Sequence, residues 1–363
     1  MFYRPAKAYI HLPALRHNLQ IAKSLAPNSK VLAVIKANGY GHGICRVAQQ
    51  LVGADGFGVA SIDEALLLRQ KGFLHRILLL EGLFSEIELP LAVQNRLDIV
   101  IHSMHQLQWL LRYQTASVIN VWIKVDTGMN RLGFPTEQIP SVIKQLEQNP
   151  NHFNIHLMSH LASADEESST AIAFTKNQIN DFNFSTEPYD FPTSLHNSAG
   201  LQSYGSFRYD WVRPGILLYG IGSTNTPFDK QAQLKTVMRL ESAVIATRWI
   251  EAGDFVGYGN DWQATKRTCV AVIAIGYGDG YPRHAPTGTP VLVDGKRVPL
   301  IGRVSMDMIT VDITEHHERI HIDSLATLWG EGLSVDEVAK FAKTISYELL
   351  CGITSRVPMV EVQ

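Results

Sequence analysis

The chain has 363 residues, of which 45% are hydrophobic and 18% charged, and its formal net charge is −2. These values are typical of a globular protein, and the near-neutral charge argues against a nucleic-acid-binding protein, which usually carries a basic excess. The three cysteines are far apart, so neither a disulfide framework nor a zinc-binding spacing is visible, and a reducing compartment such as the cytoplasm fits. No stretch approaches the roughly 18 uninterrupted apolar residues of a membrane helix, and no metal site is expected.

The first two thirds of the chain alternate between strand-like and helix-like segments. The strand-like runs are 31–36, 56–61, 76–82, 97–102, 118–125, 153–160, 192–198 and 209–220. Ser61 with Glu64, and Ser103 with Gln106, match the capping-box pattern and predict that helices begin there. Eight strands separated by helical or polar spacers predict a (β/α)8 barrel of the TIM type. An open doubly wound sheet is the competing interpretation, but no GxGxxG or GxxxxGK[ST] loop favours it.

After about residue 230 the pattern changes to short β-rich runs. Asp294-Gly295 is a hairpin turn signal, and Ser334 with Glu337 predicts one late helix. The predicted fold class is therefore α/β plus β. Residues 1–230 form an N-terminal barrel and residues 231–363 form a C-terminal, mostly antiparallel β domain. The boundary is placed in a polar, proline-containing stretch near residues 225–233.

The run VLAVIKANGYGHG, residues 31–43, combines a buried strand with an ionisable side chain. Its apolar start is typical of a parallel strand, and Lys36 stands where the apolar residues end. Gly39, Gly41 and Gly43 follow, so the backbone can turn sharply and approach a ligand. A lysine that loses part of its hydration there is shifted toward the neutral amine that Schiff-base formation requires. The ordinary alternative is a strand-end lysine that reaches solvent.

Polar side chains also follow other predicted strands. They are found in the loop from Lys124 to Arg131, at His160, at Asn197-Ser198 and at Arg213-Pro214-Gly215. Barrel enzymes build their active sites at this end of the strands from residues scattered along the chain. Each residue alone has an ordinary explanation, as a buried histidine, a turn or a surface ion pair. As a set, they form a candidate constellation.

The chain resembles the alanine racemases, which depend on pyridoxal phosphate (PLP), over essentially its whole length. The matching segments occur in the same order and at the same spacing as in that family. They are VLAVIKANGYGHG (31–43), KVDTGMNRLGF (124–134), SHLASAD (159–165), LHNSAG (195–200), VRPGILLYG (212–220), IGYGDGYPR (275–283), GRVSMDM (302–308) and SRVP (355–358). The segments that contain Lys36 and Tyr277 are together highly specific.

This resemblance implies a role for each matching residue. Lys36 would bind PLP covalently and act as one acid/base, and Tyr277 would be the second. The residues implied to hold the cofactor are Lys36, His160, Asn197 and Arg213, with Tyr40, Ser198, Gly215 and Ile216 around its phosphate. Those implied at the substrate are Arg131, Met306 and Asp307. A methionine of the β core is the rival interpretation of Met306.

Two of these roles have a physical rationale. Racemisation removes a proton from one face of Cα and delivers one to the other face, which two bases on opposite sides do most directly. A tyrosine, with a reference pKa of ~10, needs a cationic neighbour or hydrogen bonds to serve as a base. Arg213 is implied to face the pyridine nitrogen, with His160 supporting it. Because arginine stays protonated, it does not readily protonate the ring, and this favours racemisation over transamination.

Lys124 is implied to carry a carbamate that orients Arg131, and an exposed lysine is the alternative. Three positions depart from the family pattern. His196 replaces a small residue, and Asn130 replaces a glycine. Ser355 stands where many relatives have a tyrosine that contacts the phosphate, so that contact is in doubt. None of these changes removes a catalytic group.

The resemblance implies a cytoplasmic isomerase that interconverts L-alanine and D-alanine and supplies D-alanine for the peptidoglycan of the cell wall. It also implies a homodimer in which Lys36 of one subunit faces Tyr277 of the other. A racemase of the same fold that acts on serine, or on a broad set of amino acids, is the closest alternative. A decarboxylase of this PLP fold would place a glutamate where Arg213 stands. A non-catalytic PLP carrier would lack the β domain.

Overall fold

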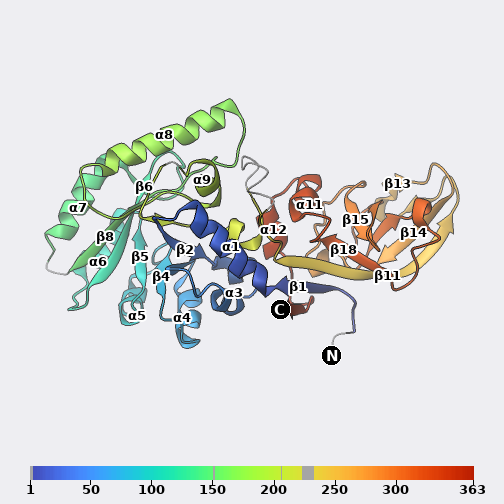
Figure 1. Ribbon diagram of the computed structural model, residues 1–363, viewed down its shortest axis with the longest axis horizontal. Coiled ribbons are helices and arrows are strands. Elements are labelled where there is room, and N and C mark those ends of the chain that lie inside the picture. The colour runs from blue at the N-terminus through green and yellow to red at the C-terminus, as the bar shows by residue number, and fades with distance from the viewer. Residues whose placement is uncertain (1–2, 150–151, 206, 223–232) are drawn as a thin grey trace. The chain divides into compact units, whose positions relative to one another are not determined.

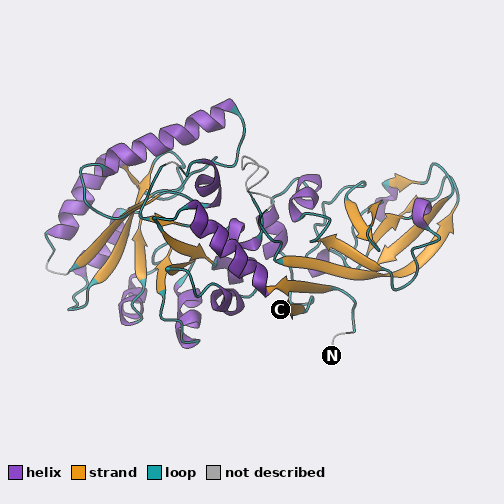
Figure 2. Cartoon of the chain, in the orientation of Figure 1, coloured by secondary structure: helices purple, strands orange, loops and turns teal. Residues whose placement is uncertain are grey.

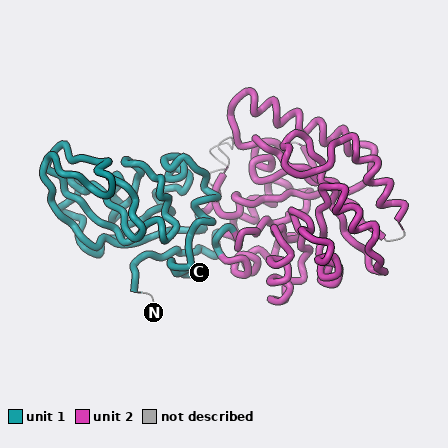
Figure 3. The backbone as a smooth tube through the Cα atoms, turned by 180° about the vertical axis from the view of Figure 1, so that it is seen from behind, with its two compact units in different colours: residues 1–14, 40–42, 236–363 teal, residues 15–39, 43–235 magenta. Residues whose placement is uncertain are grey.

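The computed structural model describes residues 3–149, 152–205, 207–222 and 233–363. The chain divides into two compact units, which Figure 3 shows in different colours. The barrel unit comprises residues 15–39 and 43–235, and the β unit comprises residues 1–14, 40–42 and 236–363. The expected boundary between residues 230 and 231 lies outside the described residues. The β unit also contains two N-terminal segments that the sequence pattern had assigned to the barrel.

Eight parallel strands close into a barrel within the barrel unit (Figure 1). They pair in the order β2, β3, β4, β5, β6, β8, β9 and β10, and the pairing of β10 with β2 closes the sheet. Their bounds are Lys30–Val34, Gly56–Val59, Arg76–Leu79, Asp98–Ile101, Ile119–Asp126, Phe153–Met158, Thr193–Ser194 and Trp211–Val212. Each strand lies in or next to a predicted run. The predicted barrel is therefore confirmed, and the open sheet is excluded.

Helices alternate with these strands along the chain (Figure 2). They are α1 (Leu12–Leu25), α2 (Lys36–Tyr40), α3 (Ile44–Gln50), α4 (Ile62–Gln70), α5 (Leu89–Gln94), α6 (Met104–Arg112), α7 (Ile139–Glu147), α8 (Ser169–Thr186) and α9 (Ser198–Ser203). Short 3-10 helices occur at η1 (Glu86–Glu88), η2 (Thr136–Gln138) and η3 (Ile216–Tyr219), and the short strand β7 (Phe134–Pro135) pairs with β6. A parallel barrel requires this alternation, because the chain must return to the same end of the barrel before each new strand begins.

The capping boxes predicted before α4 and α6 are only partly correct. Ser61 and Ser103 do precede these helices, but neither side chain makes a capping hydrogen bond. Glu64 instead uses both carboxylate oxygens as acceptors, one for the N–H of Ala60 at 2.9 Å and the other for the N–H of Asn38 at 3.1 Å. Glu64 thereby ties the start of α4 to the turn that follows β2.

The interior of the barrel is filled by side chains. The members of the buried cluster come from different strands and are Leu32, Leu78, Val100, Trp122, Met158 and Trp211. Because an eight-stranded barrel is just wide enough for its own side chains, this cluster leaves no channel through the middle. A ligand must therefore bind at an end of the strands.

The β unit is built on a mostly antiparallel sheet (Figure 1). The strands of this sheet are β1 (Lys7–His11), β11 (Met238–Ile250), β14 (Thr268–Ile273), β15 (Pro290–Val293), β16 (Lys296–Pro299), β17 (Ile309–Asp312), β18 (Leu325–Trp329) and β19 (Met359–Val362). The short strands β12 (Phe255–Val256) and β13 (Trp262–Gln263) pair with each other in a separate sheet. The first strand of the chain, β1, pairs antiparallel with β11 and parallel with the last strand, β19. The N-terminal segment is thus part of this sheet.

Turns and helices of the β unit follow the predicted signals. Asp294 and Gly295 join β15 to β16 with φ values of 45° and 73°, as a tight hairpin turn requires. Helix α11 (Val335–Phe341) begins after Ser334, whose hydroxyl accepts the N–H of Glu337, so the late helix is confirmed. Helix α12 (Ser346–Cys351) was not predicted, and η4 (Tyr258–Asn260), η5 (Tyr277–Asp279) and η6 (Thr314–His316) are short 3-10 helices.

Among the described residues, no helix combines the length and apolar character needed to cross a membrane. The same residues contain no group of three or more His, Cys, Asp or Glu side chains that could hold a metal ion. None of the three cysteines, Cys45, Cys269 and Cys351, forms a disulfide bond.

Candidate active site

Lys36 begins a left-handed turn just beyond β2. Ala37, Asn38 and Gly39 have φ values of 53°, 54° and 64°, and Tyr40 has a φ of 52°. Side chains with a Cβ atom disfavour this region by roughly 1–2 kcal/mol per residue. Three of these four consecutive residues, Ala37, Asn38 and Tyr40, carry a Cβ atom, so the segment is strained and neighbouring groups must hold it. The glycine-rich sequence predicted a sharp turn there but not its extension through residues that have side chains.

Contacts inside the barrel unit hold this turn. The N–H of Asn38 donates to Glu64 Oε1 at 3.1 Å. The side-chain oxygen of Asn38 accepts the N–H of Ile44 at 3.0 Å, and its carbonyl accepts the N–H of Gly43 at 2.8 Å. Lys36 therefore starts from a fixed backbone at the carboxyl end of the barrel strands.

The Lys36 side chain is accessible and lies beside one carboxylate. It is 39% exposed, and its Nζ lies 3.5 Å from Oε1 of Glu81. Glu81 follows β4, so its side chain starts at the same end of the barrel. Lys36 is therefore neither fully solvated nor buried, and a small ligand can reach its amine.

Lys124 lies at the carboxyl end of β6 with only 7% of its surface exposed, which excludes the alternative of an exposed lysine. Burial lowers the pKa of Lys124 to about 8, and the positive charges of Arg213, Arg131 and Lys36 add to that effect. In the part of the chain that the structure describes, Lys124 forms no ion pair. About a tenth of its amine is thus neutral at pH 7, far more than for an ordinary lysine, and carbamylation requires this neutral form.

The loop after β6 carries Arg131, which is exposed. The residue before it, Asn130, has a φ of 54°. Its N–H donates to Asp126 Oδ1 at 3.1 Å, and its side-chain amide donates to the carbonyl of Gly128 at 2.9 Å. Asparagine tolerates the left-handed region better than most residues because of such local bonds. These bonds explain how Asn130 adopts a conformation that suits glycine, the residue that the resemblance leads one to expect at this position.

Arg213 is the most deeply buried charge at this end of the barrel, with 3% of its surface exposed. Its Nη1 donates to Ser194 Oγ at 2.5 Å, and its Nη2 donates to the carbonyls of Ser159 at 2.5 Å and Leu195 at 3.2 Å. No carboxylate among the described residues pairs with it. Burial lowers the pKa of Arg213 to about 10, so the guanidinium still carries its charge at neutral pH. A buried cation with only neutral partners favours an acceptor from a ligand.

His160 lies against this guanidinium. Its Nδ1 is 3.3 Å from Arg213 Nη2. Burial, followed by the charge of Arg213, lowers the pKa of His160 well below its usual range. The imidazole is therefore neutral at pH 7 and can accept a hydrogen bond from the guanidinium. This geometry supports the implied role of His160 as a support for Arg213.

Ser198 joins two segments near the implied phosphate site. Its Oγ accepts the N–H of Gly215 at 2.9 Å and the N–H of Leu217 at 3.2 Å. Because both bonds use the oxygen as acceptor, the hydroxyl hydrogen remains available for an anion. Asn197 caps α9, and its Oδ1 accepts the N–H of Gly200 at 2.9 Å. Asn197 thus has a structural role, as the turn interpretation predicted, and it sets the start of Ser198's helix.

Ile216, implied at the phosphate, is buried at the start of η3 in the barrel unit. The other implied residues lie in the β unit. Tyr277 is 39% exposed and begins η5, and Met306 is 53% exposed, which excludes the β-core interpretation of this methionine. The N–H of Tyr277 donates to the carbonyl of Ser305 at 3.0 Å, and the N–H of Gly278 donates to that of Met306 at 2.9 Å. The Tyr277 turn and the segment of Met306 and Asp307 are therefore held side by side.

Tyr40 is buried in the β unit, and its ring centroid lies 5.7 Å from that of Tyr347. Burial and the neighbouring Tyr347 raise the pKa of Tyr40, so that its hydroxyl keeps its proton and can donate it to an anion. Ser355, where the resemblance leads one to expect a tyrosine that contacts the phosphate, is exposed.

Sequence reasoning missed several residues that organise these sites. Glu64 and Glu81 lie in the barrel unit, and Arg4 and Asp279 lie in the β unit. Glu81 could have been found by the same pattern as Lys36, because it too is an ionisable residue directly after an apolar run. Arg4 had no comparable signal, because its partners are distant in the sequence.

Comparisons with known proteins agree with this architecture. The model of the alanine racemase N-terminal domain matches residues 10–223, and that of the alanine racemase C-terminal domain matches residues 237–361. An alanine racemase from Coxiella burnetii strain RSA 331 / Henzerling II is 46% identical over 99% of this chain and 99% of its own length.

Solved structures give the same answer. The biosynthetic alanine racemase from Pseudomonas aeruginosa has a TM-score of 0.94 and 41% identity, covering 99% of this chain and 100% of its own. The alanine racemase from Bartonella henselae, solved with covalently bound pyridoxal phosphate, has a TM-score of 0.87 and 27% identity, covering 99% of both chains. With both domain models matched and relatives aligned over nearly the full length, this chain belongs to the alanine racemase family of enzymes.

Proposed function

We propose that this chain interconverts L-alanine and D-alanine, with PLP at the carboxyl end of its barrel and with Lys36 and Tyr277 as the two acid/bases. The observation that carries the proposal is the excess of positive charge at that end of the strands. Four cations, Lys36, Lys124, Arg131 and Arg213, lie there, and Glu81 is the carboxylate that pairs with one of them. Such an excess suits a cofactor with a phosphate group and a substrate with a carboxylate.

The described residues fit PLP. Arg213 is a buried cation without a carboxylate partner, and the hydroxyl hydrogen of Ser198 is free of the two bonds that its oxygen accepts. Lys36 would hold the aldehyde carbon, Arg213 would donate to the ring nitrogen, and Ser198 with Tyr40 would hold the phosphate. PLP, when bound, withdraws electrons from Cα of the amino acid and so makes its proton acidic.

The chain's own groups would then move the proton. Nζ of Lys36 takes or returns it on one face of Cα, and Oη of Tyr277 does so on the other. Arg131, exposed in the loop after β6, binds the substrate carboxylate, and Met306 and Asp307 line that side. Arg213 donates a hydrogen bond and keeps its proton, since its pKa stays well above neutrality. A ring that is not protonated limits side reactions at the cofactor.

The test is an assay of purified protein with PLP against single enantiomers, with chiral detection of the products. L-alanine should give D-alanine and the reverse, at rates well above those for serine and larger amino acids. A higher kcat/KM for serine than for alanine would favour the alternative of a serine or broad-specificity racemase. No inversion of any amino acid would contradict the proposal.

We also propose a homodimer with shared active sites, in which Lys36 of one subunit faces Tyr277 of the other. Lys36→Ala and Tyr277→Phe should each be nearly inactive. When they are mixed and subunits exchange, half of the dimers are mixed and each has one intact site of two. Activity should therefore recover to at most about a quarter of the wild-type value. No recovery, with exchange verified by mass spectrometry, would mean that a working site takes both residues from one chain.

The cellular role proposed here follows from the product. D-alanine is a building block of peptidoglycan, so a cytoplasmic supply for the bacterial cell wall is the role that fits the family. A deletion strain should need added D-alanine for growth. The wild-type gene should restore growth without D-alanine, and the Lys36→Ala gene should not. Growth without D-alanine in a strain that has no second racemase would contradict this role.

A further inference from the structure

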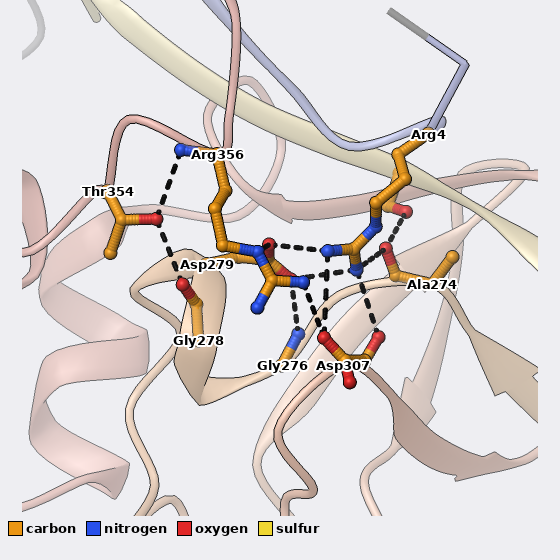
Figure 4. A network of polar contacts seen from close by, with 9 residues as sticks. Arg4, Ala274, Gly276, Gly278, Asp279, Asp307, Thr354 and Arg356 are labelled. Carbon is orange, nitrogen blue, oxygen red and sulfur yellow. Dashed lines mark hydrogen bonds and ion pairs between the residues drawn. The ribbon is translucent and has the colours of Figure 1, made fainter.

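Resting on the proposed role of Tyr277, we propose that Arg4 is a positioning residue for racemisation. Its guanidinium, locked onto the buried carboxylate of Asp279, fixes the backbone turn that presents Tyr277. Arg4 lies ahead of the first strand, far in sequence from every residue implied in the reaction. Figure 4 shows the network, and all of its members belong to the β unit.

Asp279 is the centre of this network. It has no exposed surface, and it ends the same short helix, η5, that Tyr277 begins. Its Oδ2 accepts the N–H of Gly276 at 3.0 Å, so the carboxylate joins the last residue of η5 to the residue that precedes this helix. A fully buried carboxylate is stable only when cations and hydrogen bonds compensate it.

Arg4 supplies that compensation with both arms of its fork. Its Nη1 lies 2.8 Å from Asp279 Oδ1, and its Nη2 donates to Oδ2 at 2.9 Å (Figure 4). The same Nη2 donates to the carbonyl of Ala274 at 3.3 Å and to that of Asp307 at 3.1 Å. One guanidinium thus joins the Tyr277 turn to the segment that carries Met306 and Asp307. The planar fork of arginine makes these bonds together, which the single ammonium of lysine cannot do.

The turn that carries Tyr277 packs closely against the facing segment, so it has little room to absorb a shift of Asp279. A Cβ at Gly276 would lie 2.2 Å from the carbonyl oxygen of Ser305. The bonds from Tyr277 and Gly278 to the facing segment are already at normal lengths. Because the Asp279 carboxylate accepts the N–H of Gly276, a shift of this carboxylate should displace the backbone at Tyr277.

Arg356 completes the network on the other side. Its Nε lies 3.3 Å from Asp279 Oδ1, and its Nη2 donates to Oδ1 of Asp307. Thr354 also donates to the carbonyl of Gly278 at 2.9 Å. Removing Arg4 therefore leaves Asp279 with one remaining cation. The carboxylate stays partly compensated, so the turn should loosen rather than unfold. Arg4 is 34% exposed at its side chain, which makes a substitution there tolerable for the fold.

The experiment uses the PLP-loaded enzyme and the variants Arg4→Gln and Arg4→Lys. For both, kcat should fall about 10- to 100-fold with KM little changed, because a misplaced acid/base affects the transition state more than binding. Cα-deuterated L- and D-alanine provide a second readout. The isotope effect should rise for the enantiomer whose proton Tyr277 removes and should not rise for the other. Arg297→Gln is the matched control, since it breaks an exposed arginine–carboxylate pair with Glu337 in the same unit, and it should behave as wild type.

Tyr277→Phe, measured in parallel, separates this inference from the proposed function. If Tyr277→Phe is as active as wild type, the proposed function fails. If Tyr277→Phe is inactive while both Arg4 variants keep wild-type kcat and isotope effects, the positioning role of Arg4 is overturned. A loss of kcat with unchanged isotope effects in both directions would also overturn it, because that is the signature of a smaller fraction of folded enzyme. If Arg4→Gln fails to fold, kcat and the isotope effects of Arg4→Lys, which keeps the positive charge, test the positioning role by themselves.

Discussion

The two ends of the barrel treat buried charge in opposite ways. At the carboxyl end, Arg213 and Lys124 are buried, and among the described residues neither forms an ion pair. At the amino end, Asp98 is 1% exposed and fully partnered. It accepts hydrogen bonds from Asn120 at 3.0 Å and from Trp122 Nε1 at 2.8 Å, and Arg76 Nη1 lies 3.1 Å away.

Aromatic rings seal that amino end further. His156 stacks on Trp122 with ring centroids 4.5 Å apart, and Arg76 lies over the ring of Trp211 at 5.2 Å. Paired charge and stacked rings close the barrel, whereas unpaired cations keep their attraction for an incoming anion. The difference supports the proposal that the carboxyl end binds the ligand while the amino end serves stability, as is usual for barrel enzymes.

The largest expected effect compares the two lysines that flank β2. Lys36→Ala should lower racemase activity about 1,000-fold or more and abolish the visible absorption of the bound cofactor, because the attachment point and one base are lost together. Lys30→Ala, at the amino end of the same strand, should change activity less than about twofold. Steady-state kinetics and absorption spectra check both. Full activity in Lys36→Ala would contradict the proposal that Lys36 binds the cofactor and acts as an acid/base.

A second comparison sets Arg213 against Arg76. Arg213→Glu should lower racemisation about 100-fold and raise the yield of pyruvate from alanine, because a carboxylate lets the ring nitrogen be protonated. Arg76→Gln should leave the product ratio unchanged and lower the temperature of unfolding instead. Product analysis by chromatography distinguishes these outcomes. Normal racemisation by Arg213→Glu without pyruvate would contradict the role given to this arginine.

The third comparison concerns stability at the amino end. Asp98→Ala should destabilise the protein by about 3 kcal/mol, because Arg76, Asn120 and Trp122 lose their common acceptor inside the barrel. The folded fraction should keep a normal kcat, since the catalytic end is not touched. Urea unfolding with parallel kinetics measures both quantities. Unchanged stability would show that the paired charge is not what closes this end.

The smallest effect is in the pH dependence of stability. Burial and Arg213 lower the pKa of His196 to about 4, so the unfolded chain takes up a proton below about pH 6.5 that the folded chain refuses. This contribution to stability is lost as the pH falls toward 4, at about 1 kcal/mol per pH unit. His196→Ala should therefore flatten the loss of stability between pH 6.5 and 5.

Asp98 affects the pH dependence of stability in the opposite direction to His196. Burial raises the pKa of Asp98 to about 6 despite Arg76 and the two hydrogen bonds. The folded chain therefore binds a proton there before the unfolded chain does, which adds stability as the pH falls from about 6 to 4. Asp98→Asn should make the acid loss steeper than in wild type. Thermal unfolding across this pH range tests both variants, and identical slopes in all three proteins would contradict the assignment of these groups.

Much of the fold could be predicted from sequence because parallel strands are buried on both faces. Each appears as an apolar run between polar spacers, and the rhythm of eight such runs allows little besides a barrel. The strand β1 was not predicted, and its residues were assigned to the barrel, because its pairing with β11 and β19 joins segments hundreds of residues apart. The side-chain caps of Ser61 and Ser103 were also wrong, because neither hydroxyl accepts a capping hydrogen bond. Glu64 and Gln106 instead accept the N–H groups of Ala60 and His102, the residues just before these serines.

Site residues could be predicted where the chemistry is carried by one position at the end of a strand. Lys36 and Arg213 are charges that interrupt apolar runs, which is visible in the sequence itself. Arg4 and Asp279 differ, because each matters only through the other, and they are 275 residues apart. Nothing in a single sequence signals such a pair. The left-handed turn at Ala37 was hidden for a similar reason, since its glycines are visible but Glu64, which holds it, is not nearby in sequence.

We propose above all that the carboxyl end of the barrel binds the cofactor and attaches it to Lys36. Borohydride reduction of the PLP-loaded protein, followed by proteolysis and mass spectrometry of every lysine-containing peptide, tests this most directly. We expect the reduced cofactor on Lys36 and on neither Lys124 nor Lys30. A label on one of these two lysines, or on none of the three, would contradict it.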